Sequence, residues 1–369
     1  MWRIIILVLL VLTLLAVVFL LTRFHRFSTV LKLAEKNRAF SWLVALLPLL
    51  VLALFCCVSV SAYIIVVLHL VVGFLLCALI ALAVRVFTGY EIAYDIQGTA
   101  AVVLTALWLG VGWYAAHHVS ETDYRVETDK ALRRGYRIVE IADAHLGVTL
   151  DGEKFARELE KVQALQPDAV VLVGDFVDDD SKAADMIAAC KALGDLKTAF
   201  GVYYVYGNHD EGYYTFRDFH SGRLREELTK NGVVILEDEA VLLDDSLYII
   251  GRRDRSDRVR ASMETLMQTL DREKYTVVLD HQPNDYDAEA SAGADLVLSG
   301  HTHGGHIFPA GQIGMLMGAN DALYGMETRG DTTFIVSSGI SGWAIPFKTL
   351  CRSEIAVVDI AARRTGGAA

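Results

Sequence analysis

The sequence AVVLVGDFVD at residues 169–178 decides the fold of the C-terminal two thirds of the chain. Five consecutive apolar residues, mostly β-branched, are typical of a strand that is buried on both faces. Gly174 then suits a tight turn, and the carboxylates Asp175 and Asp178 follow it directly. The stretch therefore predicts a buried strand whose carboxyl end presents two acidic side chains.

Four other apolar runs end in polar residues of the same kind. The predicted strands are 138–141, 202–206, 276–279 and 296–298, and the polar residues after them are Asp143 and His145, then Asn208, His209 and Asp210, then Asp280 and His281, then His301 and His303. Helical patterns at 153–165 and 182–193 separate the first three strands of the series, which favours an α/β domain built from βαβ units. Because ligands in open α/β sheets bind beyond the carboxyl ends of the strands, we expect the five loops to meet at one site.

The distribution of histidine also indicates one shared site. Seven of the 11 histidines follow residue 120, and five of these seven lie in the loops just described. Carboxylate, amide and imidazole ligands without thiolate suit divalent Mn, Fe, Zn or Ni. A carboxylate between two such ions can bridge them at roughly 3.5–4 Å, the spacing used for phosphoryl displacement. Asp-X-His, Gly-Asp and Gly-Asn-His-Asp alone are more often ordinary turns or loops, and His-X-His alone is a moderate metal signal. The five motifs together favour a two-metal site.

The ordered set of motifs resembles the calcineurin-like metallophosphoesterase superfamily. The motifs are Asp-X-His at 143–145, Gly-Asp-X-X-Asp at 174–178, Gly-Asn-His-Asp at 207–210, a single histidine at 281 and Gly-His-X-His at 300–303. Residues 300–305 and 336–340 are similar to a membrane-attached bacterial branch of that superfamily. The resemblance covers about residues 137–360 and implies a four-layer α-β-β-α sandwich with a dinuclear metal centre.

The resemblance also implies roles for individual residues. One metal ion would be held by Asp143, His145, Asp175 and His303, and the other by Asp175, Asn208, His281 and His301. A hydroxide bridging the two ions would attack phosphorus, and His209, oriented by Asp210, would protonate the leaving oxygen. Asp178 would support its own loop. The branch often has Gln at the position of His306, so the role of that residue stays open.

Residues 1–120 are predicted to form a membrane domain. The run 39–84 contains no acidic residue, lysine or arginine. Since a bilayer core needs about 20 apolar helical residues, this run is expected to fold back near residues 59–61 and to cross twice. The predicted spans are 3–22, 39–59, 61–84 and 97–117, with three or five spans as alternatives. A cleaved signal peptide is the alternative for the first span, but Arg23 directly after the apolar run favours a retained anchor.

Charge divides the chain into two unlike parts. Residues 1–120 carry 7 basic and 3 acidic side chains and the remainder 27 and 42, so the net charge of -11 combines a basic part with a strongly acidic one. The acidic part disfavours nucleic acid as a partner, because phosphate contacts dominate such binding. We expect a linker at 121–136, the phosphoesterase domain at 137–362 and a flexible tail at 363–369. The basic loop after the first span predicts a cytoplasmic side there, and four spans then place the phosphoesterase domain outside the cytoplasm.

Three functional hypotheses follow. The first is a membrane-anchored phosphohydrolase with two divalent metal ions, acting on a small-molecule or lipid-linked phosphate such as a lipid or nucleotide-lipid ester or diphosphate. The second is a catalytically silent membrane sensor or scaffold, which loss of a ligand would mark, and the sequence lacks none. The third is a transporter with a regulatory soluble part, for which Pro48, His69 and Gly73 are slight support. The native metal and the oligomeric state stay open.

Overall fold

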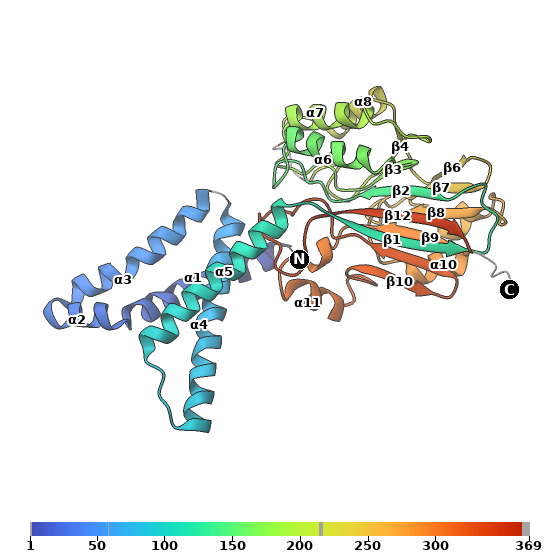
Figure 1. Ribbon diagram of the computed structural model, residues 1–369. Helices are drawn as coiled ribbons and strands as arrows, with labels where there is room; N and C mark the ends of the chain where they lie inside the picture. Colours follow the sequence, from blue (N-terminus) through green and yellow to red (C-terminus); the bar gives the residue numbers. More distant parts are fainter. Residues whose placement is uncertain (1, 58, 214–216, 364–369) are drawn as a thin grey trace. The chain divides into compact units, whose positions relative to one another are not determined.

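The computed structural model describes residues 2–57, 59–213 and 217–363 (Figure 1). The chain divides into two compact units, Met1–Gly112 and Trp113–Ala369. Each unit is described by itself.

The first unit is helical. It contains α1 (Trp2–His25), α2 (Ser28–Lys36), α3 (Arg38–Ala53), the 3-10 turn η1 (Leu54–Cys57), α4 (Val60–Thr88) and most of α5 (Tyr94–His117). Within the described residues, four segments are long and apolar enough to cross a membrane, namely Val8–His25, Arg38–Cys57, Val60–Thr88 and Tyr94–His117.

These four segments overlap the four predicted spans but differ from them at the ends. The helix expected over 61–84 continues to Thr88, because the next residue that favours a left-handed conformation is Gly89, with φ 72°. Residue 58 of the predicted span 39–59 lies outside the described residues. The short amphipathic helix α2 was not predicted. Its apolar residues are interspersed with charged ones, and the segment was interpreted only as a charged loop between the first two spans.

Two mixed sheets make up the centre of the second unit over the described residues. The first sheet has the order β1 (Ser120–Thr128), β12 (Glu354–Ala362), β2 (Tyr136–Ile141), β3 (Ala169–Val173), β4 (Val202–Val205) and β5 (Val233–Ile235). The second sheet has the order β10 (Gly325–Arg329), β11 (Thr332–Val336), β9 (Leu296–Ser299), β8 (Tyr275–Leu279), β7 (Leu247–Gly251) and β6 (Glu239–Leu243). Strands β2 to β5 run parallel to one another, as do β7, β8, β9 and β11.

Helices cover the outer face of each sheet, as Figure 1 shows for α6 (Gly152–Ala164), α7 (Ala183–Gly194) and α8 (Ser221–Lys230) on the first sheet. Apolar residues of these helices, such as Phe155 and Leu224, pack against Val139 and Val170. On the second sheet, α9 (Met263–Met267) and α10 (Tyr286–Ala292) pack against strand residues that include Phe334. The inner faces of the two sheets share a third apolar core. This arrangement confirms the predicted four-layer α-β-β-α sandwich.

The predicted linker at 121–136 is wrong in its first half. Residues Ser120–Thr128 form strand β1, which pairs in parallel with β12 along its whole length. Its side chains alternate between more buried and more exposed positions up to Val126, as in an edge strand with one solvated face. The acidic and basic residues on that outer face concealed the alternation. The expected flexible tail lies outside the described residues from residue 364 onward, and the amide of Arg363 donates to the carbonyl of Thr128 at 2.7 Å.

The strand ends that carry the predicted site lie at the same end of the first sheet as the last turn of α5. Ser120 pairs with Glu354 at the start of β12, and Ala356 pairs with Glu140 near the carboxyl end of β2. The Ser353 amide donates to the carbonyl of Ala115 at 2.8 Å, and its hydroxyl donates to that of Ala116 at 2.9 Å. The final turn of α5 is therefore fixed beside the loops that follow β2.

Glu140 is an ionisable residue inside this core. It is fully buried, and neither carboxylate oxygen has a hydrogen-bond partner among the described residues. Burial raises the pKa of Glu140 well above its usual value, and the nearby carboxylates Glu354 and Asp143 raise it further. The folded protein therefore retains a proton on Glu140 at pH values where the unfolded chain has lost it.

This proton makes a testable contribution to stability. Because the pKa of Glu140 is raised in the folded state, its contribution falls as pH rises above the unfolded value of about 4.3. The variant Glu140→Gln keeps the shape without the ionisation. We expect the melting temperature of the variant minus that of the wild type, measured on the full-length protein in detergent, to increase steadily from acidic to mildly alkaline pH. A difference that does not change with pH would contradict this account.

Candidate metal centre

The loops after five strands bring the sequence-predicted residues to one place. Asp143 and His145 follow β2, Asp175 follows β3, Asn208 and His209 follow β4, His281 follows β8, and His301 and His303 follow β9. The first sheet thus supplies the carboxylates and the second sheet most of the imidazoles. The core between the sheets holds the two sets against each other.

The first group of converging side chains is Asp143, His145 and His303. Their ligand atoms all lie within 4.8 Å of one another, and all three residues are buried. The Nε2 atoms of His145 and His303 are 3.2 Å apart, and Nε2 of His303 is 3.8 Å from Oδ1 of Asp143. Two imidazole nitrogens and a carboxylate oxygen aimed at one point are a suitable ligand set for a divalent transition metal.

The second group is Asp175, His281 and His301, whose ligand atoms also lie within 4.8 Å of one another. Oδ2 of Asp175 is 3.1 Å from Nε2 of His281 and 3.6 Å from Nε2 of His145 in the first group. The other oxygen, Oδ1, accepts a hydrogen bond from the amide of His209 at 2.8 Å. Asp175 is therefore held with one oxygen directed between the two groups.

Three of these histidines are oriented through their other ring nitrogen. Nδ1 of His281 lies 2.9 Å from the carbonyl of Val173, and Nδ1 of His303 lies 3.2 Å from that of Ser341. Nδ1 of His145 lies 3.1 Å from Oδ2 of Asp178. A carbonyl or carboxylate on Nδ1 fixes the tautomer that leaves Nε2 unprotonated, which is the form that binds metal.

Buried polar atoms at this place fit bound metal. Oδ1 of Asn208 is buried and has no hydrogen-bond partner among the described residues, and the buried Nε2 of His281 faces the Asp175 carboxylate at 3.1 Å. The amide nitrogen of Asn208 donates to the Tyr213 hydroxyl at 3.0 Å, which directs Oδ1 away from that partner. A buried polar atom without a partner is costly, and a metal ion would remove that cost.

The protonation state of His301 and His303 also favours metal binding. Burial, together with the neighbouring His281, lowers the pKa of His301 to about 4. Burial likewise holds the pKa of His303 well below its usual value, with His145 adding to the effect. Both rings are therefore neutral near pH 7, as metal ligands must be.

The backbone of these loops is unusual. Asp143, His145, Asp175, His301 and His303 all have positive φ, between 36° and 68°. Such conformations are uncommon outside glycine and cluster at functional sites. Close approach also requires glycine at two positions: a Cβ on Gly207 would lie 2.2 Å from Oδ1 of Asp175, and one on Gly300 would lie 2.5 Å from Oδ2 of Asp143.

Asp178, rather than Asp210, contacts the ring of His209. Nδ1 of His209 is 3.1 Å from Oδ1 of Asp178, while Oδ2 of Asp178 faces His145. Burial opposes a charge on His209, but the hydrogen bond to Asp178 and the charge of Asp175 outweigh it and raise the pKa of His209. The sequence reasoning treated Asp178 only as a loop support. Its position in the Gly-Asp-X-X-Asp motif was the available signal.

Asp210 has a different task from the one expected. Its buried carboxylate accepts hydrogen bonds from the amides of Asp175, Phe176, Val177 and Gly207, at 2.7 to 3.1 Å. It does not orient the His209 ring. Because neighbouring residues in a tight turn point in different directions, adjacency to His209 in the sequence was a poor guide to contact.

A buried arginine supports the loop of His281 and was not anticipated. Arg252 lies 2.9 Å from Asp280, 2.8 Å from Asp285 and 3.1 Å from Glu289. Arg260 also contacts the Asp280 carboxylate. Since Asp280 directly precedes His281, these ion pairs fix the end of β8 from behind. The apolar run 276–279 predicts a buried strand but does not indicate that Arg252 pairs with the residue that follows it.

His306 and Lys348 lie next to the first group. The ring of His306 stacks on that of His303, with centroids 5.1 Å apart, and burial lowers the pKa of His306 to about 3. Nζ of Lys348 donates to the carbonyls of Ser338 and Gly339 at 2.5 and 3.0 Å. Lys348 thus holds the loop after β11, where a Cβ on Gly339 would lie 2.7 Å from that of Asp143.

The role of Asp210 leads to a stability prediction. In Asp210→Asn, one carboxylate oxygen becomes an amide nitrogen that faces backbone N–H groups, so donors lose their acceptor. We expect a loss of about 2–4 kcal/mol in the free energy of unfolding of the second unit, with or without a metal chelator. Denaturant unfolding of the full-length protein measures this. The exposed Asp331→Asn is the matched control, and equal stability of the two variants would refute the role.

Comparison with known proteins agrees with this geometry. The calcineurin-like phosphoesterase family matches residues 136–305. A Danio rerio protein named as a transmembrane protein with a metallophosphoesterase domain is 30% identical, over 70% of this chain and 61% of its own length. Metallophosphoesterases of Aquifex aeolicus and Bacillus subtilis are also 30% identical, over 64% and 60% of this chain and 90% and 83% of their own lengths.

These relatives extend the resemblance seen in the sequence. They come from animals as well as bacteria, so the similarity is wider than the bacterial branch that the sequence suggested. The chain spans about three fifths of the length of the Danio rerio relative and of counterparts in Helicobacter pylori and Campylobacter jejuni. The match to nearly the whole Aquifex aeolicus protein, together with the family match, shows that this chain belongs to the calcineurin-like phosphoesterase family.

Proposed function

We propose that the protein is a membrane-anchored phosphohydrolase that requires two divalent metal ions. The observation that carries the proposal is the pair of buried His/Asp groups with Asp175 directed between them. Asp143, His145, Asp175 and His303 would hold one ion, and Asp175, Asn208, His281 and His301 the other. The catalytic domain would comprise residues 137–362 together with β1.

The proposed ions and the side chains around them would make different contributions to hydrolysis. Bound at these positions, two divalent ions supply Lewis-acid attraction for phosphate oxygens and lower the pKa of water near phosphorus. Asp143 and Asp175 contribute two negative charges, so the occupied site keeps a net positive charge that attracts phosphate inside an otherwise acidic unit. The hydrogen bonds to Val173, Asp178 and Ser341 hold the imidazoles ready, which avoids reorganisation during the reaction.

His209 is the proposed general acid. Its ring lies beside that of His145, with centroids 5.2 Å apart, and its raised pKa keeps a larger share of it protonated near neutral pH. Asp178 fixes Nδ1, so Nε2 is the atom that would deliver a proton to the leaving oxygen. The rings of Tyr213 and Trp343 lie 5.1 and 5.4 Å from the ring of His209 and would border the leaving group.

The substrate we favour is a small phosphate ester or diphosphate attached to a lipid. A cavity of about 400 Å³ opens beside Asn208, a size that suits a head group rather than a polymer. Its charged lining residues are Arg253, Arg258, Glu211, Glu237, Asp254 and Asp257. The ligand loops lie at the end of the first sheet that adjoins the last turn of α5. By the charge asymmetry of the loops, the domain would be outside the cytoplasm.

The metal requirement is tested with Asp175→Asn. Metal analysis of the purified full-length protein should show about two ions per chain for the wild type and a large loss for the variant, because the shared ligand is removed. Hydrolysis of a panel containing a phosphodiester, a phosphomonoester and a lipid diphosphate should be abolished, while the variant still inserts into membranes. Metal-loaded wild type that hydrolyses nothing on the panel would favour the alternative, a silent membrane sensor or scaffold.

The role of His209 is tested with two leaving groups. In His209→Ala, hydrolysis of an alkyl phosphodiester should fall by about 10²–10⁴, since an alkoxide needs a proton to leave. A nitrophenyl ester should be affected much less, because nitrophenolate leaves without one. Metal content should be unchanged, and His220→Asn, which alters a histidine at the start of α8, is the control. Equal losses on both esters would exclude His209 as the acid.

A further inference from the structure

One stretch of the second unit exposes apolar side chains next to the metal loops. From Ile307 to Met317 the chain has no charged residue and a single polar side chain, Gln312. Leu316 and Met317 are 89% and 80% exposed, and Phe308 and Ile313 are also exposed. We call Phe308, Ile313, Leu316, Met317 and the exposed Leu350 the outer apolar patch. Apolar surface of this extent is rarely left in water by a soluble domain.

The members of the outer apolar patch are held together by the fold. Helix α11 (Ala310–Leu316) packs through Gly311 on Gly305, where an added Cβ would lie 2.4 Å from the Gly305 Cα. Ile313, Leu316 and Met317 are spaced three and four residues apart, so they share one face of the helix. The amide of Phe308 donates to the Thr349 hydroxyl at 2.9 Å, which places Phe308 next to Leu350 in space.

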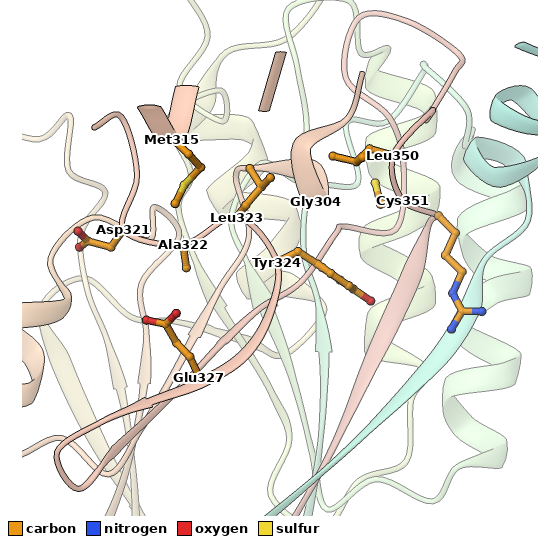
Figure 2. Close-up of a pocket in the computed structure, with 10 residues that line it drawn as sticks. Gly304, Met315, Asp321, Ala322, Leu323, Tyr324, Glu327, Leu350 and Cys351 are labelled. Atoms are coloured by element: carbon orange, nitrogen blue, oxygen red, sulfur yellow. The ribbon is translucent and has the colours of Figure 1, made fainter. Parts of the chain in front are cut away.

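A cavity of about 700 Å³ lies beside the patch. Figure 2 shows Met315, Leu323 and Leu350 around it, with Gly304 between them and the acidic Asp321 and Glu327 on the side away from Leu350 and Cys351. Gly304 directly follows His303, and Sγ of Cys351 donates to the His303 carbonyl at 2.7 Å. The cavity therefore adjoins the back of the loop that carries two of the proposed ligands.

The position of the patch in the unit identifies what covers it. Ser353 is hydrogen-bonded to Ala115 and Ala116 in the last turn of α5, a helix long and apolar enough to cross a membrane. Leu350 is three residues from Ser353, so its Cα lies within about 11 Å of that of Ser353, the residue bonded to this turn. The exposed Arg352 stands between them and suits a phosphate head group. Where such a helix ends at a bilayer surface, apolar side chains at this distance are near enough to contact the boundary between head groups and acyl chains.

We propose that the outer apolar patch is a membrane-contacting surface, which binds the acyl chains of bilayer phospholipids. The proposal rests on the membrane anchoring stated under the proposed function, because α5 must end at a bilayer surface. It does not depend on metal binding or hydrolysis. It gives the catalytic unit a second contact with the membrane, directly behind the ligand loop.

The test uses full-length protein in vesicles of phosphatidylethanolamine and phosphatidylglycerol. A small fraction of phosphatidylcholine carrying a diazirine in its acyl chain is added, and labelled peptides are mapped by mass spectrometry after illumination. We expect label in residues 307–317 as well as in α4. The reference is Val234 in β5, which is as exposed as Leu350 but lies four strand spacings, about 19 Å, from β12.

The double substitution Leu316→Gln and Met317→Gln should reduce labelling of 307–317 severalfold, with α4 labelled as before. Both residues are exposed and outside the proposed site, so the denaturant midpoint of unfolding should be unchanged and shows that the variant is folded. Label in α4 but none above the Val234 level in 307–317 would overturn the proposal and leave membrane anchoring intact. Absence of label from both α4 and 307–317 would overturn the anchoring as well.

Discussion

The arrangement of the metal centre depends on the carboxylate of Asp210. It gathers the amides of Asp175, Phe176 and Val177 after β3 and the amide of Gly207 after β4. These two loops carry Asp175, Asn208 and His209, so one buried side chain fixes the mutual position of the proposed bridging carboxylate and the proposed acid. Backbone donors suit this task, because their positions are set by strands that are paired along their lengths.

Much of the fold could be predicted from the sequence, because buried parallel strands are continuous apolar runs and their carboxyl ends meet at one edge. The α-β-β-α layers followed from the resemblance and are confirmed by the three apolar cores of the second unit. Strand β1 was not predicted, since only one of its faces is partly buried and its outer face is charged. Pairing with β12 requires two segments more than 200 residues apart, and local pattern carries no information on such a partner.

The candidate site was likewise predicted only in part from the sequence. Residue types and spacing predicted which side chains meet, since each sits at a strand end. They did not predict which atom faces which. Asp178 and Asp210 are both acidic, both buried and both near His209 in the motif order, yet only Asp178 contacts its ring. Likewise Arg252 supports His281 through Asp280, a contact that arises from side chains on the ends of β7 and β8.

Asp178 joins two parts of the proposed site that would otherwise be independent. Each of its oxygens holds a different imidazole, one on a proposed ligand and one on the proposed acid. Asparagine offers a single acceptor oxygen, and glutamate is longer by one methylene, so neither reproduces both contacts. A single codon change at this position would therefore weaken metal loading and proton delivery together.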